Sequence, residues 1–121
     1  ETLRQSVIPR AVLIDMEPKV INIVYINNRH STVVRQSGAG NNWAHGFYGF
    51  GTVVAKDILE CTRTYAENIA KRPNFLTFSS LAGGTGSGLS SKILEHLRDN
   101  YPKSPITTNT VFPYQISEIN T

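Results

Sequence analysis

The sequence predicts an α/β fold in which a parallel sheet is flanked by helices. An apolar run over 10–15 and strand-like runs over 74–81 and 106–113 alternate with two segments, 52–72 and 88–100, that show helical spacing. The first run, Ala-Val-Leu-Ile followed by an acid, is typical of a buried parallel strand. Strands that alternate with helices form parallel βαβ units, which gives the α/β class.

The first strand is predicted to lead into a turn and a short helix. The turn lies at 16–18, and Pro18 favours a helix over 18–22, since the first turn of a helix does not need its missing N–H. Residues 33–34, both valine, predict a short strand or an extended segment. A long loop rich in glycine and asparagine is predicted over 36–51.

Each of the two longer predicted helices has one apolar face. The segment 52–72 repeats apolar side chains at steps of three and four, and Pro73 is expected to end it. These side chains are Val54, Ile58, Cys61, Tyr65 and Ile69. In 88–100 the residues expected to face inward are Leu89, Ile93, Leu94 and Leu97. Residues 102–105 are predicted to connect this helix to the last strand.

Composition and charge exclude several classes of function. With 121 residues and 40% hydrophobic content, the chain is long enough for one small domain with a core. The net charge of +3 comes from dispersed basic residues, so nucleic-acid binding is not expected. No apolar stretch reaches the roughly 18 residues of a membrane span, so no membrane segment is expected. The single cysteine, Cys61, excludes an internal disulfide and is predicted to be inert core.

The most informative segment is a glycine-rich turn over 81–89, which reads Leu-Ala-Gly-Gly-Thr-Gly-Ser-Gly-Leu between a predicted strand and a predicted helix. Glycines let backbone N–H groups approach an anion, and the N-terminus of a helix adds a partial positive charge. Thr85 and Ser87 can add hydroxyl donors. The turn therefore predicts a site for a nucleotide or another phosphate-bearing ligand. The alternative is a flexible turn that binds nothing.

This turn differs from the two common phosphate motifs. A P-loop requires a lysine after its last glycine, but Leu89 follows Gly88 here and the nearest lysine is Lys92. The dinucleotide fingerprint requires three glycines at a fixed spacing that this turn does not have. The residues alone thus indicate a phosphate-bearing ligand without naming it.

Two further segments are predicted at the same edge, because ligands of parallel sheets bind beyond the carboxyl ends of strands. Asp15 and Glu17 follow the first strand, and carboxylates beside a phosphate need a cation such as Mg²⁺ between them; the alternative is a solvated acidic turn. The loop 38–44 carries asparagines that can donate to phosphate or sugar oxygens, or that serve the turn itself. Trp43 in this loop is predicted to be core. No nucleophile with an adjacent base is apparent, so no catalytic residue is predicted.

Three motifs together resemble the tubulin family. They are Arg-Ala-Val-Leu-Ile-Asp-Met-Glu-Pro over 10–18, Gln-Ser-Gly-Ala-Gly-Asn-Asn-Trp-Ala over 36–44, and Ala-Gly-Gly-Thr-Gly-Ser-Gly over 82–88. They occur in the order and near the spacing found in tubulins, and the resemblance extends from about Ile8 onward. The bacterial cell-division relatives share a loop like 83–88 but lack an equivalent of Asn-Asn-Trp-Ala. The resemblance therefore favours a eukaryotic tubulin, with a Rossmann-like nucleotide-binding domain.

Within the tubulins the chain most resembles delta-tubulin. The resemblance rests on Asp-Met-Glu-Pro-Lys-Val-Ile over 15–21, on Ala82 in place of the usual first glycine, and on Phe-Pro-Tyr over 112–114 with Glu118 after it. The segment 19–36 looks shorter than in alpha and beta forms. Protofilament neighbours touch this flank in those forms, so the ordinary lattice contacts are in doubt.

The resemblance implies a site for GTP or GDP. The loop 83–88 would wrap the α- and β-phosphates with Thr85 and Gly86 nearest, the loop 39–41 would sense the γ-phosphate, and Glu17 with Asp15 would hold Mg²⁺ through water. The residues that match nucleotide-binding positions of the family are Ala39, Gly40, Asn41, Ser80, Ala82, Gly83, Gly84, Thr85, Gly86, Ser87, Gly88, Ser117 and Glu118. The change Gly86→Val is expected to block the phosphate while leaving the fold intact.

Parts of the family's site lie outside this sequence. The first glycine-rich strand and turn would precede Glu1, whereas the guanine-reading asparagines and the acidic hydrolysis loop would follow Thr121. Residues 1–121 are therefore expected to be part of one tubulin GTPase domain that is incomplete at both ends. We expect weak or no GTP binding by these residues alone.

The function implied by the resemblance is that of a GTP-binding tubulin subunit, a structural constituent of centrioles, basal bodies or axonemes. Its partners would be other tubulin subunits and microtubule or centriolar proteins, and it would act in the cytoplasm, on the cytoskeleton, at a centriole, basal body or cilium. Two alternatives are left open. One is an actively polymerising GTPase of the alpha/beta or prokaryotic type, and the other is a nucleotide-independent adaptor with a tubulin fold.

Overall fold

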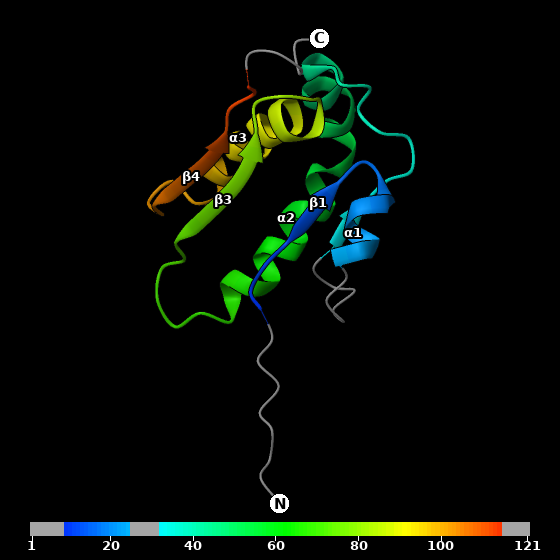
Figure 1. Cartoon of the computed structure of the whole chain (residues 1–121). Coiled ribbons are helices and arrows are strands. Elements are labelled where there is room, and N and C mark those ends of the chain that lie inside the picture. Colours follow the sequence, from blue (N-terminus) through cyan, green and yellow to red (C-terminus); the bar gives the residue numbers. More distant parts are fainter. Residues whose placement is uncertain (1–8, 25–31, 115–121) are drawn as a thin grey trace, which may run out of the picture.

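A computed structural model describes residues 9–24 and 32–114 of the chain (Figure 1). Strands and helices alternate, which confirms the predicted α/β class. In chain order the elements are β1 (Leu13–Asp15), α1 (Pro18–Val24), β2 (Thr32–Val34), η2 (His45–Phe50), α2 (Gly51–Glu67), β3 (Phe75–Ser80), η3 (Thr85–Leu89), α3 (Ser90–Asn100) and β4 (Ile106–Val111). The segments η2 and η3 are short π-helices that continue directly into α2 and α3.

All the strand pairing in the described residues is parallel, as predicted. β1 pairs with β2, with Ile14 opposite Val33, and β3 pairs with β4, with Phe78 opposite Asn109. These four strands form two separate two-stranded sheets, and no pairing joins β1 to β3 in the part of the chain described here. The sequence indicated parallel strands but carried no signal for this division.

Helix α2 supplies the centre of the core. Val54 and Ile58 on its apolar face are buried. They belong to one cluster with Met16 from the turn after β1, Val33 from β2 and Leu89 from η3. Ile14 of β1 packs against the same cluster, and Figure 1 shows α2 running behind β1. The predicted apolar face of the segment 52–72 therefore packs against the β1–β2 sheet on one side and against η3 and α3 on the other.

Helix α2 ends at Glu67, not at Arg72 as predicted. The backbone N–H of Asn68 donates to the carbonyl of Tyr65, and that of Ile69 donates to Ala66, so the last turn tightens. The side-chain amide of Asn68 also donates to the Thr64 carbonyl at 2.7 Å. These bonds satisfy carbonyl groups at the helix end well before Pro73.

The predicted loop over 36–51 is wrong in its second half, because the chain is helical from Trp43 onward. The side-chain oxygen of Asn42 accepts a hydrogen bond from the His45 N–H at 3.1 Å, which is how an asparagine caps the start of a helix.

The prediction of a core Trp43 is also wrong. Its side chain is 45% exposed, and it stacks on Phe47 with ring centroids 4.7 Å apart.

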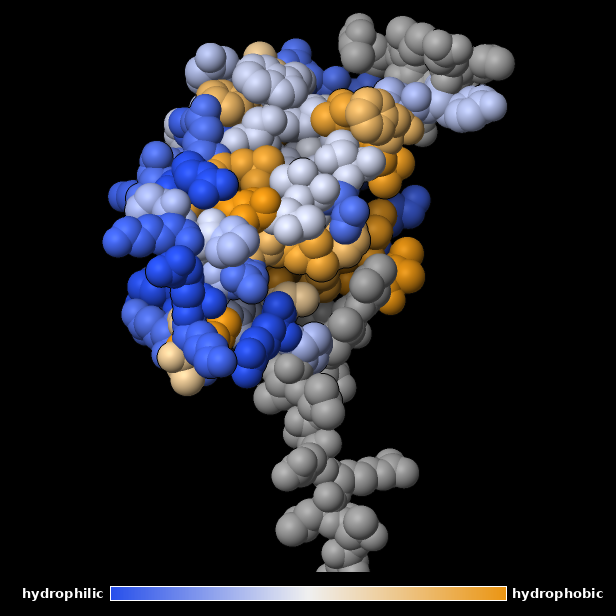
Figure 2. All heavy atoms as spheres, turned by 90° about the vertical axis from the view of Figure 1, so that its left-hand side faces the viewer, coloured by the Kyte–Doolittle hydropathy of each residue, from blue (hydrophilic) through white to orange (hydrophobic). Residues whose placement is uncertain are grey.

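The two faces of the β3–β4 sheet differ in what covers them. Figure 1 shows α3 behind this sheet, while the exposed side chains of Leu76 and Phe78 alternate with half-buried ones along β3. Val111 and Phe112 at the end of β4 are exposed as well. Figure 2 shows hydrophobic residues gathered on one flank of the molecule and hydrophilic residues on the opposite flank.

Among the described residues, no helix has the length and apolar content needed to cross a membrane.

The buried face of α2 gives a test of this core. Ile58 is 1% exposed and Val53, on the same helix, is 66% exposed. We expect Ile58→Ala to lower the free energy of unfolding by about 2–5 kcal/mol, because it leaves a cavity between both halves of the fold. Val53→Ala is the matched control and should change it by less than about 0.5 kcal/mol. Urea unfolding followed by circular dichroism measures both, and equal effects would contradict the central role of α2.

Candidate functional site

The loops that follow β1, β2 and β3 meet at one edge of the molecule. The Gly38 N–H donates to the Met16 carbonyl at 2.9 Å, which ties the loop after β2 to the turn after β1. A Cβ added at Gly38 would lie 2.9 Å from a carboxylate oxygen of Glu17. A Cβ added at Gly83 would lie 3.4 Å from the side-chain oxygen of Asn41. The structure thus brings together predicted site residues from three segments that are far apart in sequence.

The loop after β2 depends on residues that tolerate positive φ. Gly38 has φ 58°, Gly40 has φ 59° and Asn41 has φ 52°, a conformation that asparagine adopts more readily than most residues. Ala39 between them is buried in the core cluster, whereas Gly40 and Asn41 are exposed. Ala39 therefore anchors the loop, while Gly40 and Asn41 lie at the surface.

The glycine-rich turn forms the start of a long helical segment. Gly83 has φ 85°, and from Thr85 the chain is helical through η3 and α3 to Asn100. The Gly84 carbonyl accepts hydrogen bonds from the N–H groups of both Gly88 and Leu89, at 2.9 and 3.1 Å. The first N–H groups of a helix lack acceptors within it, so this end of η3 can bind an anion.

The side chains of this turn bond mainly to the turn itself. The Ser87 hydroxyl is buried and donates to the Gly83 carbonyl, and the Ser80 hydroxyl oxygen accepts the Ala82 N–H at 3.1 Å. Ser80 is the last residue of β3 and Thr85 the first of η3. The binding capacity of the turn therefore comes from backbone N–H groups, with Thr85 as the nearest hydroxyl.

Gly86 faces inward, which corrects the expectation for Gly86→Val. A Cβ at this position would lie 2.8 Å from the carbonyl oxygen of Ser80 and 3.0 Å from its nitrogen. A branched side chain would therefore collide with the end of β3 and disturb the fold, and it would not project into the ligand space.

The two predicted metal-binding carboxylates lie on the turn after β1. Asp15 ends the strand, and its side-chain oxygen accepts the Glu17 N–H at 3.3 Å. Glu17 is exposed. Within residues 9–24 and 32–114, no three His, Cys, Asp or Glu side chains form a metal cluster. Two hard oxygen ligands fit Mg²⁺, which commonly keeps several waters and takes its remaining ligands from phosphate.

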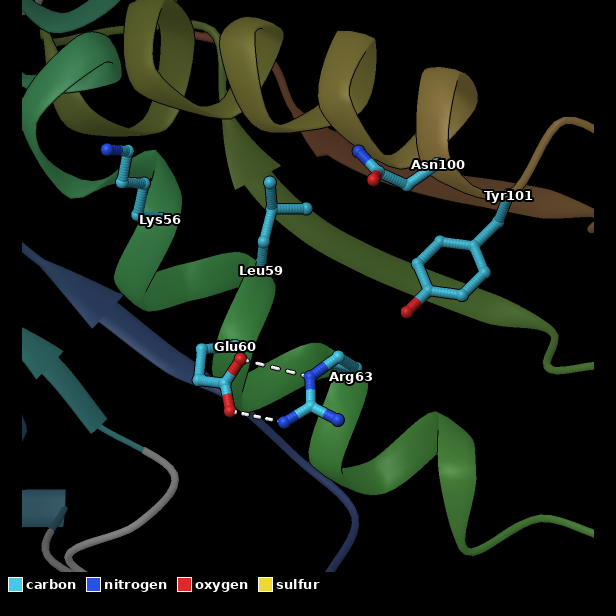
Figure 3. Close-up of a pocket in the computed structure, with 6 residues that line it drawn as sticks. All are labelled: Lys56, Leu59, Glu60, Arg63, Asn100 and Tyr101. Atoms are coloured by element: carbon cyan, nitrogen blue, oxygen red, sulfur yellow. Dashed lines mark hydrogen bonds and ion pairs between the residues drawn. The ribbon is translucent and has the colours of Figure 1, made fainter.

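A separate hollow of about 310 Å³ lies between α2 and the far end of α3 (Figure 3). Its lining residues are Lys56, Leu59, Glu60, Arg63, Asn100 and Tyr101. Glu60 and Arg63 face each other on α2, and the hydrogen bond from Arg63 lowers the pKa of the Glu60 carboxyl. The three loops lie instead beside the N-terminal ends of these helices, so this hollow is not part of the loop site.

Cys61 is half-buried on α2. Burial raises the pKa of its thiol, and the carboxylates of Asp57 and Glu60 raise it further. A raised pKa leaves little thiolate at neutral pH, so Cys61 is a poor nucleophile.

Two predicted residues, and one residue with a role that was not predicted, bear on the site. Ser117 and Glu118, predicted at the ribose side, lie outside the described residues. Asn42 is predicted only as one of two asparagines that bind a ligand or serve the turn, whereas in the structure its backbone N–H donates to the Ala39 carbonyl and its side chain caps the following helix. An asparagine directly before a helical segment is a capping signal, and here the helix begins at Trp43.

The inward position of Gly86 can be tested through stability. We expect Gly86→Ala to lower the free energy of unfolding by about 1–3 kcal/mol, because the methyl group meets the Ser80 backbone. Thr85→Ala is the control, since it removes atoms at the adjacent position. Thermal unfolding measures both variants, and a Gly86→Ala protein as stable as the unchanged chain would refute this packing.

A comparison with known families assigns the chain to a family. The family model described as Tubulin/FtsZ family, GTPase domain, matches residues 1–121, the whole of this sequence. This match supports the tubulin resemblance seen in the three motifs, at the level of the family. The chain belongs to the Tubulin/FtsZ family, GTPase domain.

Proposed function

We propose that this protein is a GTP-binding tubulin subunit whose nucleotide phosphates bind at the meeting point of the three loops. The observation that carries the proposal is the glycine-rich turn at the N-terminus of η3, which lies beside the loop 38–42; that loop in turn bonds to the turn after β1. Backbone donors at a helix N-terminus favour a phosphate over other ligands. Membership of the GTPase-domain family supports GTP or GDP as that ligand.

Each loop has a distinct part in this proposal. The N–H groups at the start of η3 bind the α- and β-phosphates, and Gly83 leaves the backbone open on that side, because only the Asn41 side chain comes within 4 Å of its Cβ position. Gly40 and Asn41, both exposed, face the terminal phosphate. The phosphate side of the proposed site is completed by Ser80, Ala82 and Thr85. The inward-facing glycines Gly84, Gly86 and Gly88 act through the shape of the turn.

Asp15 and Glu17 would hold a Mg²⁺ ion through water. They stand on the turn after β1, and Glu17 lies against Gly38 in the loop proposed to face the terminal phosphate. A bound Mg²⁺ would shield the phosphate charge from these two carboxylates. Without a cation, the same carboxylates would repel the nucleotide.

In a finer proposal, the protein is a delta-like tubulin that acts as a structural constituent of centrioles, basal bodies or axonemes. The features behind this proposal are Ala82, the Asp-Met-Glu-Pro-Lys-Val-Ile segment and the Phe-Pro-Tyr run at 112–114. Its partners would be other tubulin subunits and microtubule or centriolar proteins. Residues 1–121 would form part of one GTPase domain, completed by segments before and after them.

The metal proposal predicts a magnesium-dependent effect of Glu17. In the full-length protein with Mg²⁺, we expect Glu17→Gln to weaken GTP binding about tenfold, because the ion loses one of its two carboxylates. In EDTA the variant should bind GTP at least as tightly as the unchanged protein, because no ion is present and one of the two repelling carboxylates is gone. Glu95→Gln, an exposed carboxylate on α3, is the charge-matched control. Titration with a fluorescent GTP analogue measures these affinities, and equal affinities with Mg²⁺ would contradict the metal role of Glu17.

A second measurement separates the three candidate functions. We expect heat denaturation of the purified full-length protein to release bound GTP or GDP. We also expect the protein to form no filaments when GTP and Mg²⁺ are added. Filaments that pellet on centrifugation and release phosphate would instead identify an actively polymerising GTPase. Protein that carries no nucleotide and takes none up would identify the nucleotide-independent adaptor.

A further inference from the structure

Three glycines allow two helical segments to touch backbone to backbone. A Cβ added at Gly46 would lie 2.0 Å from the Gly84 carbonyl oxygen, and one added at Gly88 would lie 2.0 Å from the Trp43 carbonyl oxygen. At Gly84 a Cβ would lie 2.7 Å from the Asn42 carbonyl oxygen. We call this the glycine contact, formed by Gly46, Gly84 and Gly88.

A residue with a side chain does not fit at the positions of the glycine contact. Each of these positions would meet a backbone carbonyl, which is held by its own chain and cannot rotate away as a flexible side chain can. Gly84 and Gly88 are four residues apart and so lie on one face of the turn, the spacing by which small residues let helices approach closely. Glycine inside a helix normally lowers helix stability, so the contact gives a physical reason for Gly46 in η2.

The atom that meets Gly46 also controls the phosphate-facing end of η3. The Gly84 carbonyl oxygen accepts from the N–H groups of Gly88 and Leu89, and so closes the first turn. This carbonyl shares one rigid peptide plane with the Thr85 N–H, which is among the first donors of the helix. A group that pushes the Gly84 oxygen away therefore turns the Thr85 N–H as well.

We propose that Gly46 is a positioning residue for phosphate binding. It leaves room for the Gly84 carbonyl, and thereby orients the peptide plane that presents the Thr85 N–H to the phosphate. The assignment rests on the proposed nucleotide site. Gly46 belongs to the loop-and-helix segment after β2, so the geometry of the glycine-rich turn depends on a segment about 40 residues earlier in the sequence.

The test compares two alanine variants on the same helix, Gly46→Ala and Gly49→Ala. At Gly49 the atoms nearest to an added Cβ are ring atoms of the exposed His45 side chain, whereas at Gly46 they are backbone atoms of the glycine-rich turn. Titrations of the full-length protein with GDP and with guanosine, which lacks phosphate, give the affinity ratio of the two ligands. We expect Gly46→Ala to lower GDP affinity at least about tenfold with little change for guanosine, and Gly49→Ala to leave the ratio unchanged.

The other outcomes are separable. If the unchanged protein binds no GDP, the proposed function fails and the inference fails with it. If the unchanged protein binds GDP and folded Gly46→Ala binds it equally well, the inference alone is overturned. A parallel loss of GDP and guanosine affinity would indicate a merely structural role and would also overturn it.

A second variant covers the case in which Gly46→Ala does not fold. Asn42→Ala removes the side-chain cap on the His45 N–H and loosens the same segment without adding an atom. We expect it to lower GDP affinity relative to guanosine as well, by a smaller factor than Gly46→Ala. An unchanged ratio in folded Asn42→Ala would then overturn the proposal.

Discussion

The burial of one face of α2 is the interaction on which the other elements depend. Val54 and Ile58 pack with Met16 and Val33 from the β1–β2 half and with Leu89 from η3, which leads from β3 into α3. The two strand pairs do not hydrogen bond to each other within the described residues, so they are related by side-chain packing on this helix and by the backbone contact between the segment 42–46 and the glycine-rich turn. Because the loops of the site extend from both strand pairs, the position of α2 also sets the geometry of the site.

Close backbone packing sets the fine geometry that hydrophobic burial leaves open. Burial is non-directional and does not fix a loop to within an ångström. The glycine contact does so, because carbonyl oxygens of one segment occupy the space where side chains of the other would be. Positive φ at Gly38, Gly40, Asn41 and Gly83 then bends each loop toward the shared edge. The shape of the candidate loops thus depends largely on glycines.

Much of the fold was predictable because its signals are local. Apolar runs and helical spacing gave the strands and the two long helices, and the glycine-rich turn indicated a phosphate before any family was considered. The errors also have local physical causes. Glycines at 46, 49 and 51 conceal the start of the helical segment at Trp43, and Asn68 ends α2 before Pro73 through hydrogen bonds that propensity does not reveal. Trp43 was expected in the core, but stacking on Phe47 holds it at the surface.

The sequence by itself determined the α/β class, the parallel strands, the order of the three loops and the family, because each depends on residue type and spacing along the chain. Only the tertiary structure decided what each glycine of the turn packs against. Gly83, Gly84, Gly86 and Gly88 are equivalent in sequence, yet Gly83 is open, Gly86 packs on Ser80, and Gly84 and Gly88 pack on the segment 42–46. The reason is that the environment of a glycine is set by whichever segment crosses it, and here that segment is distant along the chain.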